Sequence, residues 1–598
     1  MNQKRENLLN LALETDEAQR ARTMDLNVGY EPVTRTWELI VKFHGDLTGA
    51  VRAVSEEIIV EILIAGYGIL TVPEVLVDEV SDLEQIEYLE MPKRFFYTAA
   101  DGIQYDDCFA PVIFGEPYLT GRGVLILVAD SGIDWRRRDF IDASGNSRIR
   151  FLWDQTLVAA GVDAPPEGFN MGVEINQEQI NSALRIQDES RLLEAIPSID
   201  RSGHGTAVAG IAAGANGSAD YLGAAPESEL LIVKLGTPDA QSFPRTTELM
   251  RAVTWGLQKA RQLQMPLVMN LSFGNCYGAH DGSSLLERFL DNAVEIGRTV
   301  ICVGSGNEGA AAGHVSGNVF GPGGRLRART ARVELAVAEY ESNLRVQLWQ
   351  NYSDEYKIYL IAPGGERAEL TAPVAEGKFV LNLEQTVILA YQGEPAPYAV
   401  AKELYLEFLP VGSGYVRSGI WTFVIEPVKV VTGQFYLYLS DSATRNEGTA
   451  FVTPTPDVTL TIPSTAARVI TVGAYDEIYS AYADFSGRGY ADPDRTIGVI
   501  TAGLVKPDLV APGVQILAPD LYGGYAPVTG TSFATPIVSG ACALMMEWGI
   551  VRGNDPFLYG EKVKAYLRAG AVPLRGEAQY PNDRVGFGAL CLQNSLPV

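Results

Sequence analysis

Three side chains in the sequence could together attack a peptide carbonyl through a hydroxyl group. Such chemistry needs a nucleophilic hydroxyl, a base that takes its proton and a carboxylate that orients the base. Asp130 follows the apolar run 124–129, at the carboxyl end of an expected strand, where open α/β sheets build their sites. His204 lies between two glycines before a helix-like stretch, and Ser532 ends a Gly-Thr-Ser turn before an apolar helix.

Each of these residues, taken alone, has a simpler structural explanation. An Asp at a strand end is commonly a turn former, and a His flanked by glycines is commonly a loop residue. Ser532 fits an ordinary helix N-cap, since Ser is favoured there and Pro536 is tolerated in a first turn. The chain has only four histidines, which leaves few candidates for the base. Only the three residues as an ordered set favour catalysis.

Their order along the chain, Asp130, His204 and Ser532, is the order found in subtilisins. The surrounding sequences resemble the Asp, His and Ser boxes of the subtilisin-like serine proteases (subtilase, S8 family). The matching stretches are VADSGID at 128–134, GHGT with VAG within 203–210, and GTS with ATP within 530–536. The resemblance covers most of 121–317 and 461–547. It implies a serine endopeptidase that works through an acyl-enzyme.

Two further stretches resemble the substrate-binding segments of the same family. NLSFG at 270–274 is similar to the strand that pairs with the substrate backbone, and CVGSGNEG at 302–309 to the segment that carries the oxyanion-hole asparagine. The resemblance implies that Asn307 and the backbone N–H of Ser532 hold the oxyanion. Glu308, near the expected S1 pocket, hints at a basic P1 residue. The substrate-binding residues that the resemblance implies are Ser272, Phe273, Gly274, Gly304, Ser305 and Gly306.

The sequence also departs from the family pattern. Ala207 and Ile537 stand where many members carry a further histidine, although neither position belongs to the expected triad. The loop 214–221 and Asp139 resemble a family calcium site, which leaves a structural calcium as an open alternative. The expected chemistry requires no cofactor, and we assign no metal ligand.

The elements that must position these residues indicate an α/β fold with two additions. Apolar runs such as VLILVAD and LVMNLSF alternate with helix-like stretches at 204–215 and 246–263, which predicts a parallel sheet flanked by helices. Short aromatic-rich strands between about 325 and 450 predict an inserted all-β sandwich, jelly-roll-like in type. We expect four segments: an N-terminal extension and pro-domain (1–100), the first part of the subtilisin-like domain (101–322), the inserted sandwich (323–455) and the second part of the subtilisin-like domain (456–598).

The N-terminal segment reads as a small α+β unit with strands at 37–42, 67–77 and 86–90 and a helix over 47–61. It resembles the family's inhibitory pro-domain, which assists folding and is cut by the enzyme itself. We therefore expect self-cleavage between about Phe95 and Cys108.

A closer resemblance is to the clostridial Csp spore-germination proteases. It rests on the inserted sandwich, the stretch EMPKR at 90–94 and the tail from Glu547 to Pro556. In that branch the pro-domain stays bound non-covalently and the substrate is a spore cortex-lytic proenzyme. Two alternatives remain: an intracellular subtilase of broad specificity, and a catalytically silent pseudoprotease that acts as a binding or signalling module. The intact Asp130, His204, Ser532 and Asn307 weigh against the silent module.

Composition narrows the possible partners and location. The formal net charge of −26 argues against a nucleic-acid partner, because phosphate binding needs clustered Lys and Arg. The acidic residues of the N-terminus exclude a secretory signal peptide, and no run of 18 apolar residues suggests a membrane span. The five cysteines show no C-x-x-C spacing and read as reduced thiols. We expect a monomeric, cytoplasmic or spore-associated protein that acts on protein substrates.

Overall fold

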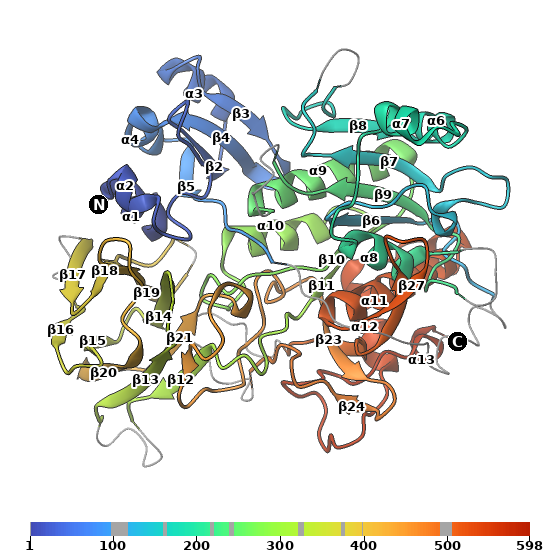
Figure 1. Cartoon of the computed structure of the whole chain (residues 1–598). Coiled ribbons are helices and arrows are strands. Elements are labelled where there is room, and N and C mark those ends of the chain that lie inside the picture. The colour runs from blue at the N-terminus through green and yellow to red at the C-terminus, as the bar shows by residue number, and fades with distance from the viewer. Residues whose placement is uncertain are drawn as a thin grey trace.

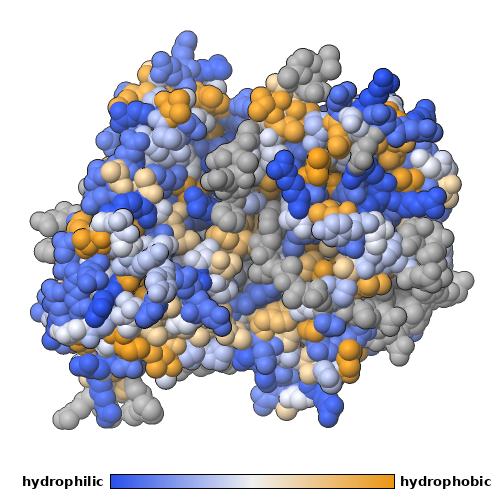
Figure 2. Space-filling view, in the orientation of Figure 1, coloured by the Kyte–Doolittle hydropathy of each residue, from blue (hydrophilic) through white to orange (hydrophobic). Residues whose placement is uncertain are grey.

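The structure is a computed structural model that describes residues 2–96, 118–159, 164–215, 221–237, 244–320, 328–371, 377–397, 399–490 and 505–597. Figure 1 shows three parts: the N-terminal unit in blue, the β-sandwich in yellow and green below it, and an α/β domain that carries both the green and the red segments. On the face shown in Figure 2, hydrophilic side chains cover most of the surface and apolar ones form separate patches.

A nine-stranded sheet forms the centre of the α/β domain. Its strand order is β24-β23-β11-β10-β6-β9-β7-β8, and β25 also pairs with β23. The inner strands are parallel, while β8 and β24 add antiparallel edges. The strands are β6 (Leu125–Asp130), β7 (Ile149–Asp154), β8 (Val173–Asn176), β9 (Glu229–Lys234), β10 (Leu267–Leu271), β11 (Thr299–Gly304), β23 (Ile470–Asp476), β24 (Ala481–Tyr482) and β25 (Leu509–Pro512).

Helices cover both faces of this sheet, because its strands are apolar on both sides. In β6, Ile126 and Val128 pack into the core under α8 and α11, while Leu125 and Leu127 pack toward α9 and α10. The helices are α6 (Gln177–Ala183), α7 (Glu189–Ala195), α8 (His204–Ala213), α9 (Thr246–Leu263), α10 (Leu285–Val294), α11 (Thr531–Met546), α12 (Gly560–Gly570) and α13 (Leu592–Ser595), with the short helices η3 (Arg138–Phe140) and η5 (Glu547–Val551) and the hairpin β26 (Ile516–Pro519)–β27 (Tyr525–Val528). The fold is therefore the predicted α/β class.

One helical stretch among the described residues, Thr531–Val551, is long and apolar enough to cross a bilayer. In its most apolar window 83% of the residues are buried inside the molecule. It serves here as the core helix α11 and its continuation η5.

The N-terminal unit is an antiparallel sheet with order β1-β2-β4-β3, in which β5 also pairs with β2. The predicted helix over 47–61 is wrong beyond residue 54, because residues 59–62 form a strand paired with β4. The elements are α1 (Asn7–Glu14), α2 (Glu17–Arg20), β1 (Tyr30–Glu31), β2 (Thr36–Phe43), α3 (Leu47–Val54), β3 (Ile59–Ile62), η1 (Ile64–Gly66), β4 (Tyr67–Pro73), η2 (Glu74–Leu76), α4 (Val77–Ser81) and β5 (Ile86–Glu90).

The inserted part is an all-β sandwich, as predicted. A six-stranded sheet, β12-β21-β14-β19-β18-β17, faces a five-stranded sheet, β16-β15-β20-β13-β22, across one apolar core. The first strand starts at His314, ahead of the expected boundary at 323. The strands are β12 (His314–Asn318), β13 (Ala331–Val337), β14 (Leu344–Asn351), β15 (Glu355–Ile361), β16 (Arg367–Glu369), β17 (Lys378–Leu383), β18 (Thr386–Gln392), β19 (Ala401–Pro410), β20 (Gly419–Lys429), β21 (Gln434–Leu439) and β22 (Ala450–Phe451), followed after β21 by η4 (Ser442–Thr444).

The N-terminal unit packs against both other parts. Its apolar core continues into Tyr391 and Tyr405 of the sandwich and Tyr277 of the α/β domain. Arg345 of the sandwich pairs with Asp25 over 2.5 Å. These contacts bury apolar area and a charge pair, and so tie the three parts into one assembly.

The cysteines differ from expectation at one position. Cys276, Cys302 and Cys542 are buried free thiols, as predicted. Cys591 is disulfide-bonded, which contradicts the prediction that all five are reduced. Cys108 lies outside the described residues.

Candidate active site

The structure brings Asp130 and His204 into direct contact. Asp130 is the last residue of β6, and His204 is the first residue of α8. His204 Nδ1 lies 2.7 Å from Asp130 Oδ1, and the two residues are 6% and 0% exposed. A Cβ on Gly205 would lie 2.2 Å from the carbonyl oxygen of Gly132, so only glycine lets α8 begin this close to the strand end.

Asp200 holds the loop that carries His204, a role that the sequence motifs did not indicate. Its Oδ1 accepts hydrogen bonds from Ser131 Oγ and from the backbone N–H of Gly203. Its Oδ2 accepts from the backbone N–H and the hydroxyl of Thr206. Asp200 is 3% exposed and therefore fixes both ends of the Asp130–His204 contact from behind.

Ser532 is the second residue of α11, a helix that starts directly after Gly530, whose φ of +143° favours glycine. Its Oγ donates a hydrogen bond of 2.8 Å to the carbonyl oxygen of Ser272, and its side chain is nearly buried. The His204 ring lies 5.3 Å from the ring of Phe533, the next residue. The base and the hydroxyl thus come from adjoining helix starts, α8 and α11.

Asn307 follows β11 and faces the same pocket as Ser532. Its Oδ1 accepts hydrogen bonds from the backbone N–H of Thr531 (3.1 Å) and from the Thr531 hydroxyl (3.0 Å). These two bonds engage the acceptor end of the amide and leave Nδ2, the donor end, available beside Ser532. The arrangement suits stabilisation of negative charge on a substrate oxygen.

Five of the six predicted substrate-binding residues line this pocket: Ser272, Phe273, Gly274, Gly304 and Gly306. Ser305 does not, because its backbone N–H bonds to Val472 and its hydroxyl lies 3.2 Å from that of Ser486. Gly306 has a φ of +87°, and a Cβ there would lie 2.4 Å from Thr461. The pocket also includes Asp441 and Ala443 from the end of the sandwich insertion, which the motifs did not indicate.

The segment that follows the N-terminal unit lies in the groove leading to Ser532. The backbone N–H of Phe95 donates to the carbonyl oxygen of Pro244 over 2.8 Å, and that of Phe96 donates to the carbonyl oxygen of Gly274 over 3.2 Å. The Phe95 ring is fully buried, 4.7 Å from that of Phe273. Phe96 itself lines the Ser532 pocket. A polypeptide is thus bound as an added antiparallel strand.

Glu308 does not offer a free charge to the pocket. Its Oε1 accepts hydrogen bonds from the backbone N–H and hydroxyl of Ser442, and Arg445 lies 3.7 Å from its other oxygen. Asp441, whose pKa burial raises to about 6, lies 3.6 Å from Arg345. Because both carboxyls have an arginine nearby, this geometry does not favour a basic P1 side chain.

The positive charge of Arg345 and Arg445 also argues against a metal ion beside these carboxyls. Cys276, Glu308 and Asp441 place possible ligand atoms within 4.8 Å of one another, but the two arginines already supply positive charge there. At the expected calcium site, the two Asp139 oxygens accept hydrogen bonds from Arg137 and Tyr525, so this carboxylate fits a calcium ion poorly. Residues 216–220 of the expected calcium loop lie outside the described residues.

A profile of the subtilase family matches residues 121–392 and 443–588, which is more than half of the sequence. The chain belongs to the subtilase family. Residues 3–93 of this subtilase also match the Csp protease B prodomain. The N-terminal unit is therefore a prodomain of the CspB type.

A solved structure, the CspB protease of Clostridium perfringens, is similar over 81% of this chain and 94% of that one, with 34% identity and a TM-score of 0.71. Serine protease AprX of Bacillus subtilis is 33% identical over 159 residues, 23% of this chain and 32% of AprX. Minor extracellular protease Vpr of the same organism is 26% identical over 426 residues, 67% of this chain and 46% of Vpr. The match spans less than half the length of these two curated relatives.

Proposed function

We propose that this subtilase is a serine endopeptidase with Ser532 as nucleophile, His204 as base and Asp130 as the orienting carboxylate. The 2.7 Å contact between His204 Nδ1 and Asp130 Oδ1 carries the proposal. It keeps the proton on Nδ1 and so leaves Nε2 to accept the proton of the Ser532 hydroxyl.

In the proposed reaction, Ser532 Oγ bonds to the substrate carbonyl carbon while its proton passes to His204 Nε2. Asn307 Nδ2 and the backbone N–H of Ser532 donate hydrogen bonds to the oxyanion that forms. The imidazolium then protonates the departing amine, which leaves an acyl-enzyme. A water molecule then attacks the acyl carbon while His204 takes its proton. His204 returns a proton to Ser532 Oγ as the acyl group leaves. No cofactor takes part in these steps.

The first substrate in this proposal is the chain's own prodomain. In an antiparallel ladder the partner numbers have a constant sum, and Phe96 is opposite Gly274. Counting along the sequence with this sum, we propose that Thr98 is the residue before the cut bond, since Ser532 Oγ contacts the carbonyl oxygen of Ser272. Residues 97–108 of the expected cleavage region lie outside the described residues, so this assignment is a count from Phe96. It predicts cleavage of the Thr98–Ala99 bond.

We further propose that the cut prodomain stays bound non-covalently to a monomeric, cytoplasmic or spore-associated enzyme. The apolar core that the N-terminal unit shares with the sandwich and the α/β domain supports retention. The likeness to the C. perfringens CspB protease supports a germination role, in which the substrate is a spore cortex-lytic proenzyme.

Covalent labelling tests the nucleophile. A fluorophosphonate added to purified, self-processed enzyme should form one adduct, which peptide mapping assigns to Ser532. The variant His204→Ala should lose the adduct, because the hydroxyl is then not activated. A purified chain that is neither cut nor labelled, even after the prodomain is stripped off, would favour the silent binding module instead.

A further inference from the structure

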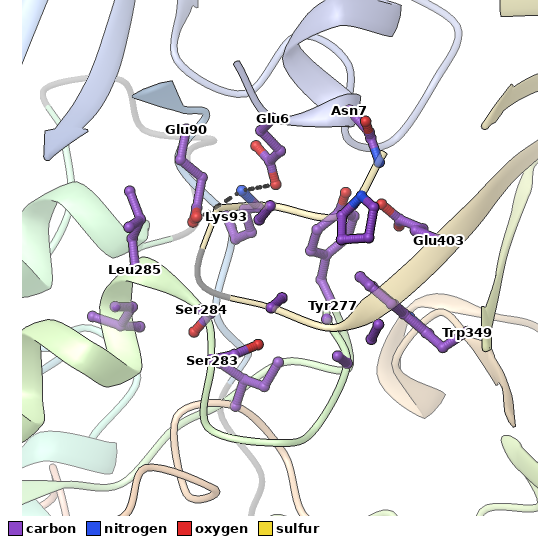
Figure 3. A pocket seen from close by; sticks show the side chains of 18 of the residues that line it. Glu6, Asn7, Glu90, Lys93, Tyr277, Ser283, Ser284, Leu285, Trp349 and Glu403 are labelled. Carbon is purple, nitrogen blue, oxygen red and sulfur yellow. Dashed lines mark ion pairs between the residues drawn. The ribbon is translucent and has the colours of Figure 1, made fainter. Parts of the chain in front are cut away.

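A second pocket lies where the N-terminal unit, the β-sandwich and the α/β domain meet (Figure 3). About 80 Å³ of it can hold the centre of a water-sized molecule, within about 810 Å³ of space free of protein atoms that is partly open to solvent. In Figure 3, Glu6, Glu90 and Lys93 approach it from the N-terminal side, and Trp349 and Glu403 from the sandwich. Neither Ser532, His204 nor Asn307 lines it, so this pocket is separate from the proposed active site.

Glu403 is a buried carboxyl without a cationic partner. It is 4% exposed, and its carboxyl accepts a hydrogen bond of 2.5 Å from Gln347 Nε2 and a further side-chain hydrogen bond from Asn7. Among the described residues, neither Lys93 nor Arg345 forms an ion pair with Glu403. Their positive charges lower its pKa only from a longer distance. Burial raises the pKa of Glu403 to about 7. A cation beside it would relieve the cost of burying its charge.

The neighbouring cations are already engaged. Lys93 Nζ lies 2.6 Å from Glu6 and 3.2 Å from Glu90. Arg345 pairs with Asp25 and lies 3.6 Å from Asp441. The pocket wall therefore carries three carboxyls, those of Glu6, Glu90 and Glu403, against one ammonium group. Burial raises the pKa of Glu6 to about 8, so at pH 7 this carboxyl is mostly protonated and Glu90 balances the Lys93 ammonium. Glu403 is therefore the carboxyl left for a cationic ligand, and a ligand carboxylate beside it is disfavoured.

Two buried polar groups in the lining lack hydrogen-bond partners. Among the described residues, neither Tyr277 Oη nor Trp349 Nε1 has one, and Tyr277 is 7% exposed. Trp349 lies directly opposite Glu403 on the paired strands β14 and β19, so the two side chains share one face of the sheet. An indole N–H can only donate, whereas a tyrosine hydroxyl can also accept. A ligand that satisfies these groups must therefore carry both a positive charge and a hydrogen-bond acceptor.

We propose that this pocket binds a small amino alcohol, with its ammonium group on Glu403 and its hydroxyl oxygen accepting from Trp349 Nε1. The ammonium has three donors and can also satisfy Tyr277 Oη. The short carbon chain lies against Leu285 and Ile462 of the lining. Because the lining residues come from all three parts, bound ligand stabilises their assembly.

The first test uses the full chain with Ser532→Ala, which cannot cut itself in the proposed reaction, and three probes of equal carbon number. These are 3-amino-1-propanol, propylammonium and 1-propanol, each at pH 7 and constant ionic strength. We expect 3-amino-1-propanol to raise the unfolding midpoint and to bind at least ten-fold more tightly than the other two. Equal binding of 1-propanol, or no binding by any of the three, overturns the proposal.

A matched pair of variants localises the effect. Glu403→Gln keeps the size and the acceptor but removes the charge, and should weaken 3-amino-1-propanol at least ten-fold. Glu341→Gln changes another buried carboxyl of the sandwich, which accepts from Asn446 and Thr449 outside the pocket, and should leave binding unchanged. Equal loss in both variants, or in neither, contradicts the assignment.

If Glu403→Gln does not fold, the number of protons released when the ligand binds provides the test. The cation lowers the pKa of Glu403, so binding at pH 7 should release a proton. Calorimetry in two buffers of different ionisation enthalpy measures this release. Binding without any proton release overturns the placement of the ammonium on Glu403.

Discussion

The backbone N–H of Phe96 donates a hydrogen bond of 3.2 Å to the carbonyl oxygen of Gly274, in the groove that leads to Ser532. The chain that ends the prodomain thus binds as an antiparallel strand where a substrate would bind. A segment held in this way blocks the groove to other proteins. In the proposed function it is also the first peptide that the enzyme cuts.

Replacing Asp130 by Asn should lower the rate of self-cleavage about 10⁴-fold, because an amide no longer holds His204 in the tautomer that accepts the Ser532 proton. The rate is followed on a denaturing gel from the moment the chain has refolded. Asp134→Asn is the matched control, since Asp134 pairs with Arg136 rather than with His204. A fall of less than ten-fold for Asp130→Asn would show that Asp130 does not orient the base.

Replacing Asn307 by Ala should lower kcat about 10²- to 10³-fold and change KM little, because the donated hydrogen bond strengthens only as the oxyanion forms. This range is that of the equivalent donor in another subtilisin-like enzyme. The assay is hydrolysis of a fluorogenic peptide by processed enzyme. Thr531→Val removes one of the two bonds that orient the Asn307 amide and should give a smaller loss. An effect of Asn307→Ala on KM alone would contradict the oxyanion role.

The junction of the α/β domain with the sandwich should weaken in acid. Burial lowers the pKa of His280 to about 4, so this residue is neutral in the folded chain and takes up a proton on unfolding below about pH 6.5. Its contribution is present at neutral pH and is lost as the pH falls from 6.5 toward 4. At 1.36 kcal/mol for each pKa unit, the loss at pH 5 is about 2 kcal/mol.

His280→Asn tests this contribution, since Asn does not titrate and tolerates the positive φ of 54° at this position. Urea unfolding of the Ser532→Ala chain at pH 7 and pH 5 should show a smaller acid loss in the double variant. An identical loss with and without His280 would rule out this explanation.

Prodomain docking should depend on pH in the opposite sense. Burial raises the pKa of Glu407 to about 7, and its carboxyl accepts a hydrogen bond from the backbone N–H of Met24 in the prodomain. The docked state therefore favours protonated Glu407, and this contribution is lost as the pH rises through 7. If the undocked carboxyl has its ordinary pKa, the affinity of the cut prodomain should fall about ten-fold from pH 6 to pH 8. Gel filtration at both pH values measures retention, and Glu407→Gln should flatten the difference.

The sequence predicted those site residues that lie in local motifs. Asp130, His204, Ser532 and Asn307 each sit in a short stretch with recognisable neighbours, and the structure places Asp130 against His204 and Asn307 in the pocket of Ser532. Asp200 was missed because its role depends on partners brought together by folding, Ser131 and Thr206.

Elsewhere long-range pairing overrode local patterns. Residues 59–62 continue an apolar spacing compatible with a helix, yet they form β3 because β4 offers a strand partner. Ser305 lies within the expected substrate segment, but its backbone bond to Val472 on β23 directs it away from the pocket. Asp441 joins the pocket from the far end of the insertion, a contact that no local pattern could indicate.

The mass of the purified chain tests the central claim most directly. Wild-type protein and Ser532→Ala, prepared identically, are analysed by intact mass spectrometry and by sequencing of any new N-terminus. The proposed function predicts that wild-type protein is cut once between Thr98 and Ala99, while Ser532→Ala keeps its full length. A wild-type chain that stays uncut, or the same cut in Ser532→Ala, would contradict self-processing by Ser532.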